Sequence, residues 1–379
     1  METKLLNGNN KEAIAEASKI LQDGGLVAFP TETVYGLGAD ALNADAAAKI
    51  YAAKGRPSDN PLIVHIADTD AVEKLADLET MNRTHPDMVK KAHMLMEAFW
   101  PGPLTIIFPK LAIVPDGTTG GLPTVAIRMP SHPIAQELIR TSGVSIAAPS
   151  ANTSGRPSPT TAQHVWEDMD GRIEMILDGG AVGIGIESTI VDMTGTIPTI
   201  LRPGFITKTM LSEIVGDVTI DPAIIEPDPN LRPKAPGMKY THNAPHGTLS
   251  IVEAVADESA NRASLHSGVK VSYNATEAET LRVAEKIKAL VNEKEAQGYR
   301  VAILTTKEHA SLYKNYSHVL IVGEGSKGQT ISARLYAALR ECDSEQMEYM
   351  YSEAFDQNEL GGAIMNRLLK AAGHRVITV

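Results

Sequence analysis

The chain is 379 residues long, which favours two domains over one. Hydrophobic residues make up 43% and charged residues 21%, the proportions of an ordinary soluble protein. No apolar run reaches the roughly 20 residues that a membrane-spanning helix needs, and the polar N-terminus does not resemble a secretory signal. We therefore expect a cytoplasmic protein that does not associate with membranes.

The cysteine count and the net charge limit the kinds of site further. One cysteine, Cys342, cannot form an internal disulfide or a cysteine-based zinc site, and we expect an idle thiol in a helix. A net charge of −11 argues against stable, sequence-independent binding of nucleic acid, which needs many phosphate contacts. A local basic pocket for a small anion is still compatible with this charge.

The first half of the chain alternates helical and strand patterns, which predicts an α/β domain over residues 1–215. A helix is expected from Asn10 to Gln22 and another from Asn43 or Asp45 to Lys54, ended by Gly55. A third helix should end near Phe99. Short apolar runs predict strands at residues 26–29, 62–66, 104–108, 124–127, 144–148, 173–177 and 188–191. The order of these strands in a sheet cannot be read from the sequence.

A proline-rich segment at residues 216–248 interrupts this pattern. Six prolines lie in it, and proline can continue neither a helix nor a central strand. Such a connector is either a plain linker or a segment laid over a functional surface. Beyond it, strands at residues 249–253, 301–305, 319–322 and 376–379, with long helices at 276–294 and 330–340, predict a smaller α/β domain over residues 249–379.

Four loops of the first domain are rich in hydroxyl, amide and cationic groups. They lie at residues 29–38, 54–61, 149–158 and 183–189, and the Arg-Pro-Gly string at 202–204 follows the last of them. Arginine, lysine, hydroxyl and backbone N–H groups together suit an anionic ligand at the strand ends of an α/β sheet. Each loop alone also has a structural explanation, such as ordinary turn chemistry or, for Lys54 and Arg56, a favourable position at a helix C-terminus.

A glycine-rich string at residues 323–328 is the nearest approach to a known nucleotide motif. The spacing Gly-x-Gly-x-x-Gly follows a predicted strand and precedes a predicted helix, the context of dinucleotide binding, with Asp343 or Glu345 as candidate partners for a ribose. A lone match of this kind is weak evidence, and a tight turn in a Rossmann-like accessory domain is the favoured explanation. No phosphate-binding loop of the Gly-x-x-x-x-Gly-Lys-Ser/Thr type occurs.

Taken together, the loops resemble the threonylcarbamoyl-AMP synthase family. The resemblance begins with Pro-Thr-Glu-Thr-Val-Tyr-Gly-Leu at residues 30–37 and continues, in the family's order, at 54–57 with 60–62, 100–105, 128–130, 149–152, 187–189 and 202–204. Further strings at 236–240 and 361–368 are similar to the longer members. The resemblance implies a YrdC-like twisted-sheet catalytic domain and a smaller Rossmann-like domain. The linker that joins them would cover the active site as a lid.

The resemblance also implies a reaction and its partners. The amine of L-threonine takes up bicarbonate or CO₂, and the resulting carbamate attacks the α-phosphorus of ATP, so that pyrophosphate leaves with Mg²⁺. Other proteins then transfer the threonylcarbamoyl group to an adenosine in tRNA. Among the family's positions, Lys54 and Arg56 are implied as catalytic clamps. No protein-borne metal site is implied.

The remaining site residues fall into two implied groups. The threonine-binding positions are Thr33, His65, Arg128, Ala148 and Ser188, and the ATP-binding positions are Arg56, Asn60, Thr124, Ser150, Asn152, Ser158 and Arg202. Arg128 suits a carboxylate because its planar fork binds two oxygens. One departure concerns the linker, where longer members carry a tyrosine after the histidine equivalent to His242 and this chain has Asn243.

Three other functions fit part of the sequence. Carbamoyl-AMP formation for hydrogenase maturation uses a similar domain but needs paired-cysteine zinc fingers, which a single cysteine excludes. An RNA-binding YrdC-like module would have to overcome the acidic net charge. A nucleotide-sensing regulator would depend on residues 323–328 alone.

Overall fold

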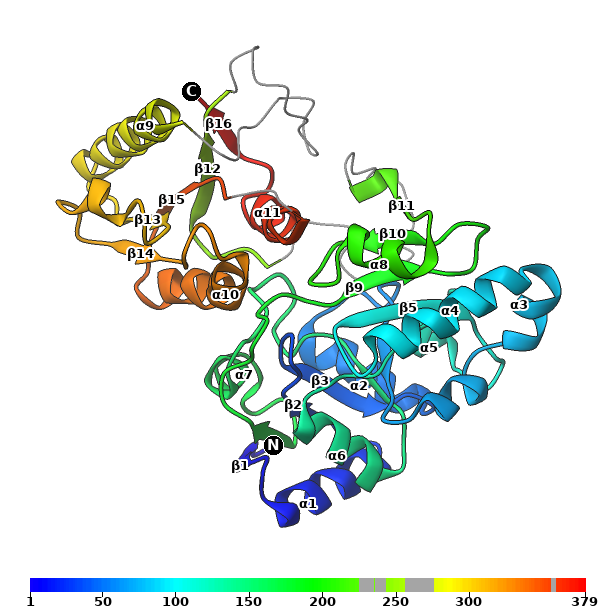
Figure 1. Cartoon of the computed structure of the whole chain (residues 1–379). Coiled ribbons are helices and arrows are strands. Elements are labelled where there is room, and N and C mark those ends of the chain that lie inside the picture. Colours follow the sequence, from blue (N-terminus) through cyan, green and yellow to red (C-terminus); the bar gives the residue numbers. More distant parts are fainter. Residues whose placement is uncertain (225–234, 236–242, 256–275, 356–358) are drawn as a thin grey trace. The chain divides into compact units, whose positions relative to one another are not determined.

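The computed structural model describes residues 1–224, 235, 243–255, 276–355 and 359–379 (Figure 1). It divides into two units, Met1–Ser154 with Ser158–Lys239, and Gly155–Pro157 with Tyr240–Val379. Each unit is an α/β fold, as predicted. Most of the predicted linker, including His242 and the string at 236–240, lies outside the described residues.

The described part of the first unit is built on a mixed sheet in the order β1-β8-β2-β3-β7-β4-β6-β5-β9-β10-β11. Its strands are β1 (Lys4–Asn7), β2 (Val27–Phe29), β3 (Gly36–Asp40), β4 (Ile63–His65), β5 (Leu104–Pro109), β6 (Thr124–Arg128), β7 (Ile146–Ala148), β8 (Met175–Asp178), β9 (Thr189–Asp192), β10 (Thr199–Arg202) and β11 (Thr219–Ile220). Its helices are α1 (Lys11–Gln22), α2 (Ala44–Lys54), α3 (Leu78–Thr84), α4 (Pro86–Phe99), α5 (Asp116–Thr119), α6 (Pro133–Ser142), α7 (Ala162–Met169) and α8 (Lys208–Val215), with 3₁₀ turns η1 (Thr69–Lys74) and η2 (Pro222–Ile224).

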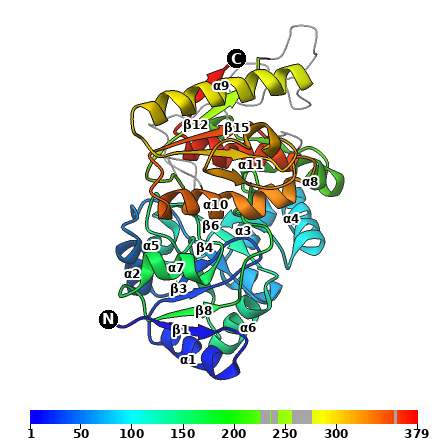
Figure 2. The same cartoon turned by 90° about the vertical axis from the view of Figure 1, so that its left-hand side faces the viewer.

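Two hydrophobic cores cover the two faces of this sheet. Helices α1 and α6 pack side by side on one face, and α2, α4, α7 and α8 contribute to the core on the other (Figures 1 and 2). Strand β2 shows the two-residue alternation that this arrangement needs, since Val27 and Phe29 enter the first core and Ala28 the second. Inner strands such as β2, β4 and β7 are therefore buried on both sides, whereas the edge strand β1 is largely exposed.

The predicted ends of α1 and α2 are confirmed. Asn10 caps α1 by accepting a hydrogen bond from the N–H of Glu12. Asn43 caps α2 in the same way, and Gly55 ends this helix in the left-handed conformation with φ 63°. Lys54 is thereby placed in the last turn of α2 and is buried.

The prediction that residues 29–38 form one loop is wrong in its second half. Gly36–Asp40 is strand β3, hydrogen-bonded between β2 and β7 in the interior of the sheet. A Cβ atom at Gly38 would lie 2.6 Å from Ile146 Cγ2 and 2.8 Å from the Phe29 ring. Two glycines in a strand suggest a loop by propensity, but here the bulky neighbours fill the space that side chains would need.

Ala235 is a described residue of the predicted linker. It is fully buried in a cluster with Ile63, Ile107, Ile190 and Leu201, which come from β4, β5, β9 and β10. This small apolar side chain therefore packs against the strands of the first unit.

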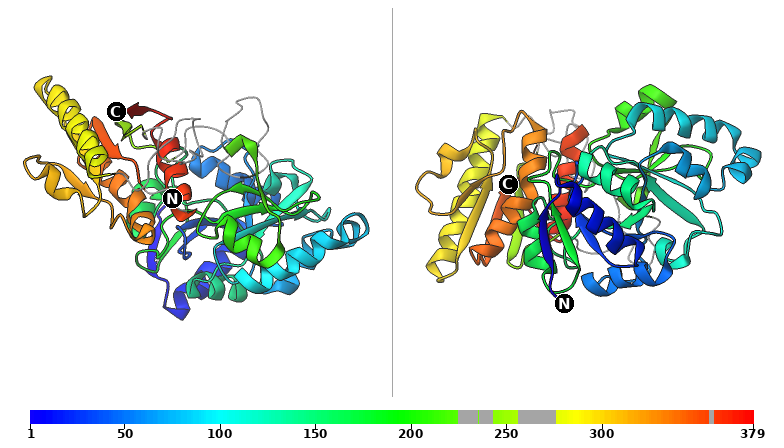
Figure 3. Two further views of the ribbon diagram at one scale, coloured as in Figure 1. Left: turned by 45° about the horizontal axis from the view of Figure 1, so that its top comes forward. Right: turned by 90° about the horizontal axis from the view of Figure 1, so that it is seen from below.

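The second unit has a parallel sheet in the order β14-β13-β15-β12-β16 in its described part. The strands are β12 (Thr248–Glu253), β13 (Val301–Thr305), β14 (Val319–Ile321), β15 (Tyr349–Glu353) and β16 (Val376–Thr378). Helix α9 (Glu277–Ala296) lies on one face with η3 (Ala310–Tyr313), and α10 (Gly328–Ser344) and α11 (Glu359–Ala371) lie on the other (Figures 2 and 3). The expected Rossmann-like parallel fold is observed, although β15 and α11 were missed.

Because Gly38 is enclosed by Phe29 and Ile146, Gly38→Ala should destabilise the first unit by about 1–3 kcal/mol through overpacking. Gly195→Ala is the matched control, since the nearest atom to its added Cβ is 4.0 Å away. Urea unfolding followed by circular dichroism measures both. Equal stability of the two variants would contradict this account of β3.

Candidate functional site

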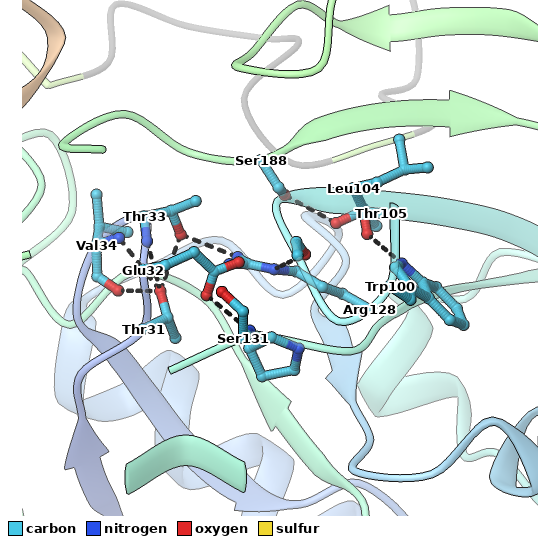
Figure 4. A network of polar contacts seen from close by, with 12 residues as sticks. Thr31, Glu32, Thr33, Val34, Trp100, Leu104, Thr105, Arg128, Ser131 and Ser188 are labelled. Atoms are coloured by element: carbon cyan, nitrogen blue, oxygen red, sulfur yellow. Dashed lines mark hydrogen bonds and ion pairs between the residues drawn. The ribbon is translucent and has the colours of Figure 1, made fainter. Parts of the chain in front are cut away.

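Polar side chains from five segments meet beside the ends of β4, β5 and β6 (Figure 4). His65 and Arg128 are paired residues on the parallel strands β4 and β6, and Thr105 lies opposite Arg128 on β5. Glu32 and Thr33 reach the same place from the turn after β2, and Ser188 from the residue before β9. We call these six residues the Arg128 cluster.

Arg128 is only 4% exposed, so its charge needs partners inside the protein. Its Nη2 donates to Glu32 Oε1 at 2.6 Å, and its Nη1 donates to Thr33 Oγ1 at 2.9 Å. Nε makes a longer contact of 3.4 Å to the Gly102 carbonyl oxygen. The second Glu32 oxygen accepts from the Ser131 N–H at 3.1 Å. One N–H on each terminal nitrogen of Arg128 has no partner among the described residues, which suits a carboxylate ligand.

The turn after β2 is fixed by its own hydroxyl groups. Thr31 Oγ1 donates to the Val34 carbonyl oxygen at 2.6 Å and lies 2.9 Å from Thr33 Oγ1 (Figure 4). Glu32 and Thr33 also accept backbone hydrogen bonds from Ile184 and Gly185 through their carbonyl oxygens. The predicted loops at 29–38 and 183–189 are thus brought together, and Thr33 is held against Arg128.

Ser188 is held by two residues. Its Oγ lies 2.8 Å from Thr105 Oγ1 and accepts from Arg202 Nη2 at 3.1 Å, while Arg202 Nε donates to its carbonyl oxygen at 3.0 Å. Arg202 was expected among the ATP-binding residues, and these bonds place it directly on Ser188, a predicted threonine-binding residue. The backbone after Arg202 approaches so closely that a Cβ at Gly204 would lie 2.5 Å from the Thr189 nitrogen.

His65 is kept neutral by its surroundings. The side chain is 4% exposed, its Nδ1 lies 3.0 Å from the Ile63 carbonyl oxygen, and its ring stands edge-on to Phe29. Burial, reinforced by the positive charge of Arg128, lowers the pKa of His65 to about 3. His65 can therefore give or accept hydrogen bonds at neutral pH, but it adds no charge.

A second group of predicted residues surrounds Lys54. The buried Lys54 Nζ donates to the carbonyl oxygens of Ser150 and Asn152 and approaches Asn152 Oδ1 at 3.4 Å. Ser150 Oγ donates to Asn152 Oδ1 at 2.5 Å. Carbonyl oxygens carry only partial charge, so these contacts orient the ammonium group without neutralising it. The loops at 54–61 and 149–158 are thus brought together.

Arg56 and Asn60 complete this side. Arg56 donates to the carbonyl oxygens of Asn60 at 3.3 Å and Pro61 at 3.1 Å. Desolvation lowers the pKa of Arg56 to about 10, so its guanidinium remains charged at neutral pH. Asn60 is 4% exposed, and its buried Oδ1 has no hydrogen-bond partner among the described residues. A buried amide oxygen in this state can accept a hydrogen bond from a water molecule or from a ligand.

The other predicted residues are less closely joined. Ala148 ends β7 and pairs with Ile63, and the buried Ser158 donates to Glu187 Oε1 at 2.7 Å. Thr124 is the first residue of β6 and pairs with Pro109, whereas Arg128 is the last residue of the same strand. Thr124 precedes Arg128 by four positions in an extended strand, so the two residues lie about 13 Å apart.

Sequence reasoning missed two members of the Arg128 cluster, Glu32 and Thr105. Both lie in strings that were recognised, at residues 30–37 and 100–105. Neither was singled out, because a glutamate in a turn and a threonine in a strand are common there. Burial reveals them, since Thr105 is fully buried and the Glu32 side chain is 14% exposed beside Arg128.

Features outside these two groups fit structural roles. In the glycine-rich loop the Gly325 N–H is occupied by Glu308 Oε2 at 2.8 Å. Asp343 and Glu345 lie at the far end of α10, about 22 Å along the helix from this loop, so the idea that they bind a ribose there is wrong. Cys342 is buried, and burial raises the pKa of its thiol to about 12, as expected for an idle thiol.

Metal-binding clusters and membrane spans are both absent from the part of the chain that the structure describes. The described residues contain no group of three or more His, Cys, Asp or Glu side chains placed to hold a metal ion. No helix in the described ranges is long and apolar enough to cross a membrane.

Comparison with known proteins identifies the family. Residues 19–204 match the family described as "Telomere recombination", and residues 206–373 match the C-terminal domain of threonylcarbamoyl-AMP synthase. The threonylcarbamoyl-AMP synthase of Bacillus subtilis is 46% identical over 97% of this chain and 95% of its own length. The chain therefore belongs to the threonylcarbamoyl-AMP synthase family, in the form that carries the additional C-terminal domain.

Relatives of two kinds support this assignment. The Pyrococcus abyssi synthase is 40% identical over 98% of both chains. A crystal structure of P. abyssi Sua5 complexed with L-threonine matches with a TM-score of 0.84, 40% identity and full coverage of both chains. A putative synthase of Mycobacterium tuberculosis is 36% identical over 54% of this chain and 89% of its own length, so shorter relatives match about half of the chain. These findings favour the synthase over the RNA-binding interpretation.

Because burial holds the pKa of His65 near 3, below its ordinary value of 6.5, the folded state resists protonation that the unfolded chain accepts. The stability that His65 contributes is complete above pH 6.5 and is lost as the pH falls towards 3. His65→Gln should remove this dependence. Relative to the variant, the wild type should lose up to about 1.4 kcal/mol per pH unit between pH 6 and 4, measured by urea unfolding. Parallel pH profiles would contradict the assignment.

Proposed function

We propose that this protein is an L-threonylcarbamoyladenylate synthase. It would convert L-threonine, bicarbonate or CO₂, and ATP into threonylcarbamoyl-AMP and pyrophosphate, the first step of N6-threonylcarbamoyladenosine formation in tRNA. The observation that carries this proposal is the full-length match to P. abyssi Sua5, whose structure was solved with L-threonine. The curated relatives that match the whole chain have the same activity in their names.

The Arg128 cluster supplies the groups that an amino acid needs. We assign L-threonine to Thr33, His65, Arg128, Ala148 and Ser188. The two N–H groups of Arg128 without a described partner suit the carboxylate, and the neutral His65 can offer a hydrogen bond without adding charge. Glu32 provides the opposite charge for Arg128 in the absence of a ligand.

The residues around Lys54 supply the groups that a nucleotide needs. We assign ATP to Lys54, Arg56, Asn60, Thr124, Ser150, Asn152, Ser158 and Arg202. Lys54 and Arg56 would stabilise charge that grows on the phosphate oxygens as the carbamate oxygen bonds to the α-phosphorus and the bond to pyrophosphate breaks. Arg202 contacts Ser188 and so would join the two substrate sites. No covalent nucleophile is needed, because positioning and charge stabilisation account for such transfers.

Two further parts of the proposal concern partners. Mg²⁺ binds phosphate oxygens readily and dehydrates reluctantly, so we propose that it enters with the triphosphate of ATP. The product would pass to the proteins that transfer the threonylcarbamoyl group to tRNA. A cytoplasmic location stays a prediction.

The test of this function is pyrophosphate release from ATP with L-threonine and bicarbonate both present or each omitted. Release should require both, and serine or glycine should replace threonine poorly. ATP consumption that ignores threonine would contradict the substrate assignment. No consumption under any condition would contradict the reaction.

Arg56→Ala should abolish turnover, to below about 1% of the wild-type rate, because one of the charges that stabilise the transferring phosphate is lost. The fold should persist, since the substitution removes two hydrogen bonds to loop carbonyl oxygens and leaves the hydrophobic cores intact. Arg83→Ala, at an exposed ion pair on α3, is the control and should retain full activity. Full activity of Arg56→Ala, with a normal melting temperature for both variants, would overturn the placement of ATP.

A further inference from the structure

Thr105 has a position that the substrate assignments do not explain. It lies on β5 directly opposite Arg128 on β6, and its side chain is fully buried. Its Oγ1 lies 2.8 Å from Ser188 Oγ, which comes from the segment that leads into β9 (Figure 4). Strands β5 and β9 are parallel neighbours with Leu104 opposite Thr189, so this distance is fixed by the sheet.

The hydrogen bonds of Ser188 can be counted completely. A serine hydroxyl has one proton to donate and two lone pairs that accept. Arg202 Nη2 can only donate, and it occupies one lone pair at 3.1 Å. The contact with Thr105 therefore uses either the second lone pair of Ser188 or its proton.

Both hydroxyl groups are buried, since Thr105 is fully buried and Ser188 is 1% exposed, so without a ligand either arrangement leaves one proton unsatisfied. A bound ligand decides between them. Within the described ranges, Ser188 is the one hydrogen-bond partner of the Thr105 side chain, so if Ser188 donated, the Thr105 proton would stay without an acceptor when a ligand contacts Ser188. If Thr105 donates, its proton is satisfied, both lone pairs of Ser188 are occupied, and the Ser188 proton can be satisfied by an oxygen of the ligand.

We propose that Thr105 is a positioning residue that makes the Ser188 hydroxyl an obligate donor to the amino-acid substrate. With both lone pairs used, Ser188 can only give its proton, and it therefore selects an acceptor oxygen and disfavours an N–H or ammonium group in that place. The carboxylate is the acceptor that would lie beside Arg128. This inference rests on the proposed function, in which Ser188 contacts L-threonine.

The experiment compares Thr105→Val, which keeps the shape and removes the hydroxyl, with Thr105→Ser, which keeps the hydroxyl. Pyrophosphate release by the full-length protein gives KM for L-threonine and for ATP. Thr105→Val should raise KM for L-threonine about fivefold, the change expected for one neutral hydrogen bond, and leave KM for ATP within about twofold. Thr105→Ser should return KM for L-threonine to near the wild-type value.

A double-mutant cycle separates this role from a general structural one. If Thr105 acts through the Ser188 hydroxyl, Thr105→Val should have no further effect on KM for L-threonine once Ser188→Ala is present. Thr3→Val is the matched control, because Thr3 is a buried threonine whose hydroxyl bonds the Ile173 carbonyl oxygen beside β1, the strand that begins the sheet order. Its KM values should not change.

Two results would overturn the role of Thr105, and a third would overturn the proposed function. An unchanged KM for L-threonine in Thr105→Val, or the same rise with and without Ser188→Ala, would overturn the role of Thr105. If Thr105→Val does not fold, Thr105→Cys, of similar size and a weak donor, takes its place with the same expectation. A wild type that releases pyrophosphate without needing threonine would instead overturn the proposed function.

Discussion

The buried guanidinium of Arg128 constrains most of what surrounds it. A charge that is 4% exposed must be paired and hydrogen-bonded, and removal of one partner of such a pair is strongly destabilising. Glu32 provides the opposite charge and Thr33 a hydroxyl, so the turn after β2 has to reach the end of β6. The same positive charge contributes to keeping His65 neutral. One buried charge thus links the sheet, the turn and the protonation state of the site.

The neighbouring hydroxyl groups are constrained in a similar way, because each hydrogen bond between them has one donor and one acceptor. Arg202 donates to Ser188, and Ser188 meets Thr105, which is opposite Arg128 on the next strand. Strands β5, β6 and β10, with the residue that leads into β9, hold these groups at fixed spacing, so each hydroxyl has few choices of partner. A site built on strand ends is rigid, and rigidity favours catalysis by positioning and charge stabilisation over covalent chemistry.

Local features were predicted well where the physical signal is local. The caps of α1 and α2 follow from the side chains of Asn10 and Asn43, and Gly55 ends α2 because it adopts a left-handed conformation easily. Strand β3 was missed, because the reason why its glycines are tolerated lies in Phe29 and Ile146, which only the folded sheet brings against them. The Gly-x-Gly-x-x-Gly string appeared suited to a phosphate, but the carboxylate of Glu308, brought close by the fold, occupies a loop N–H.

The sequence by itself determined the family, the α/β class of both units and the identity of most candidate site residues, because motif strings and periodic patterns are properties of neighbouring residues. Only the tertiary structure decided which of those residues meet. It placed Arg202 on Ser188 and Thr124 at the far end of β6, and it revealed Glu32 and Thr105 as partners in the site. The physical reason is that burial and hydrogen-bond pairing depend on strand order, and contacts between residues about 80 to 100 positions apart leave no local pattern in the chain.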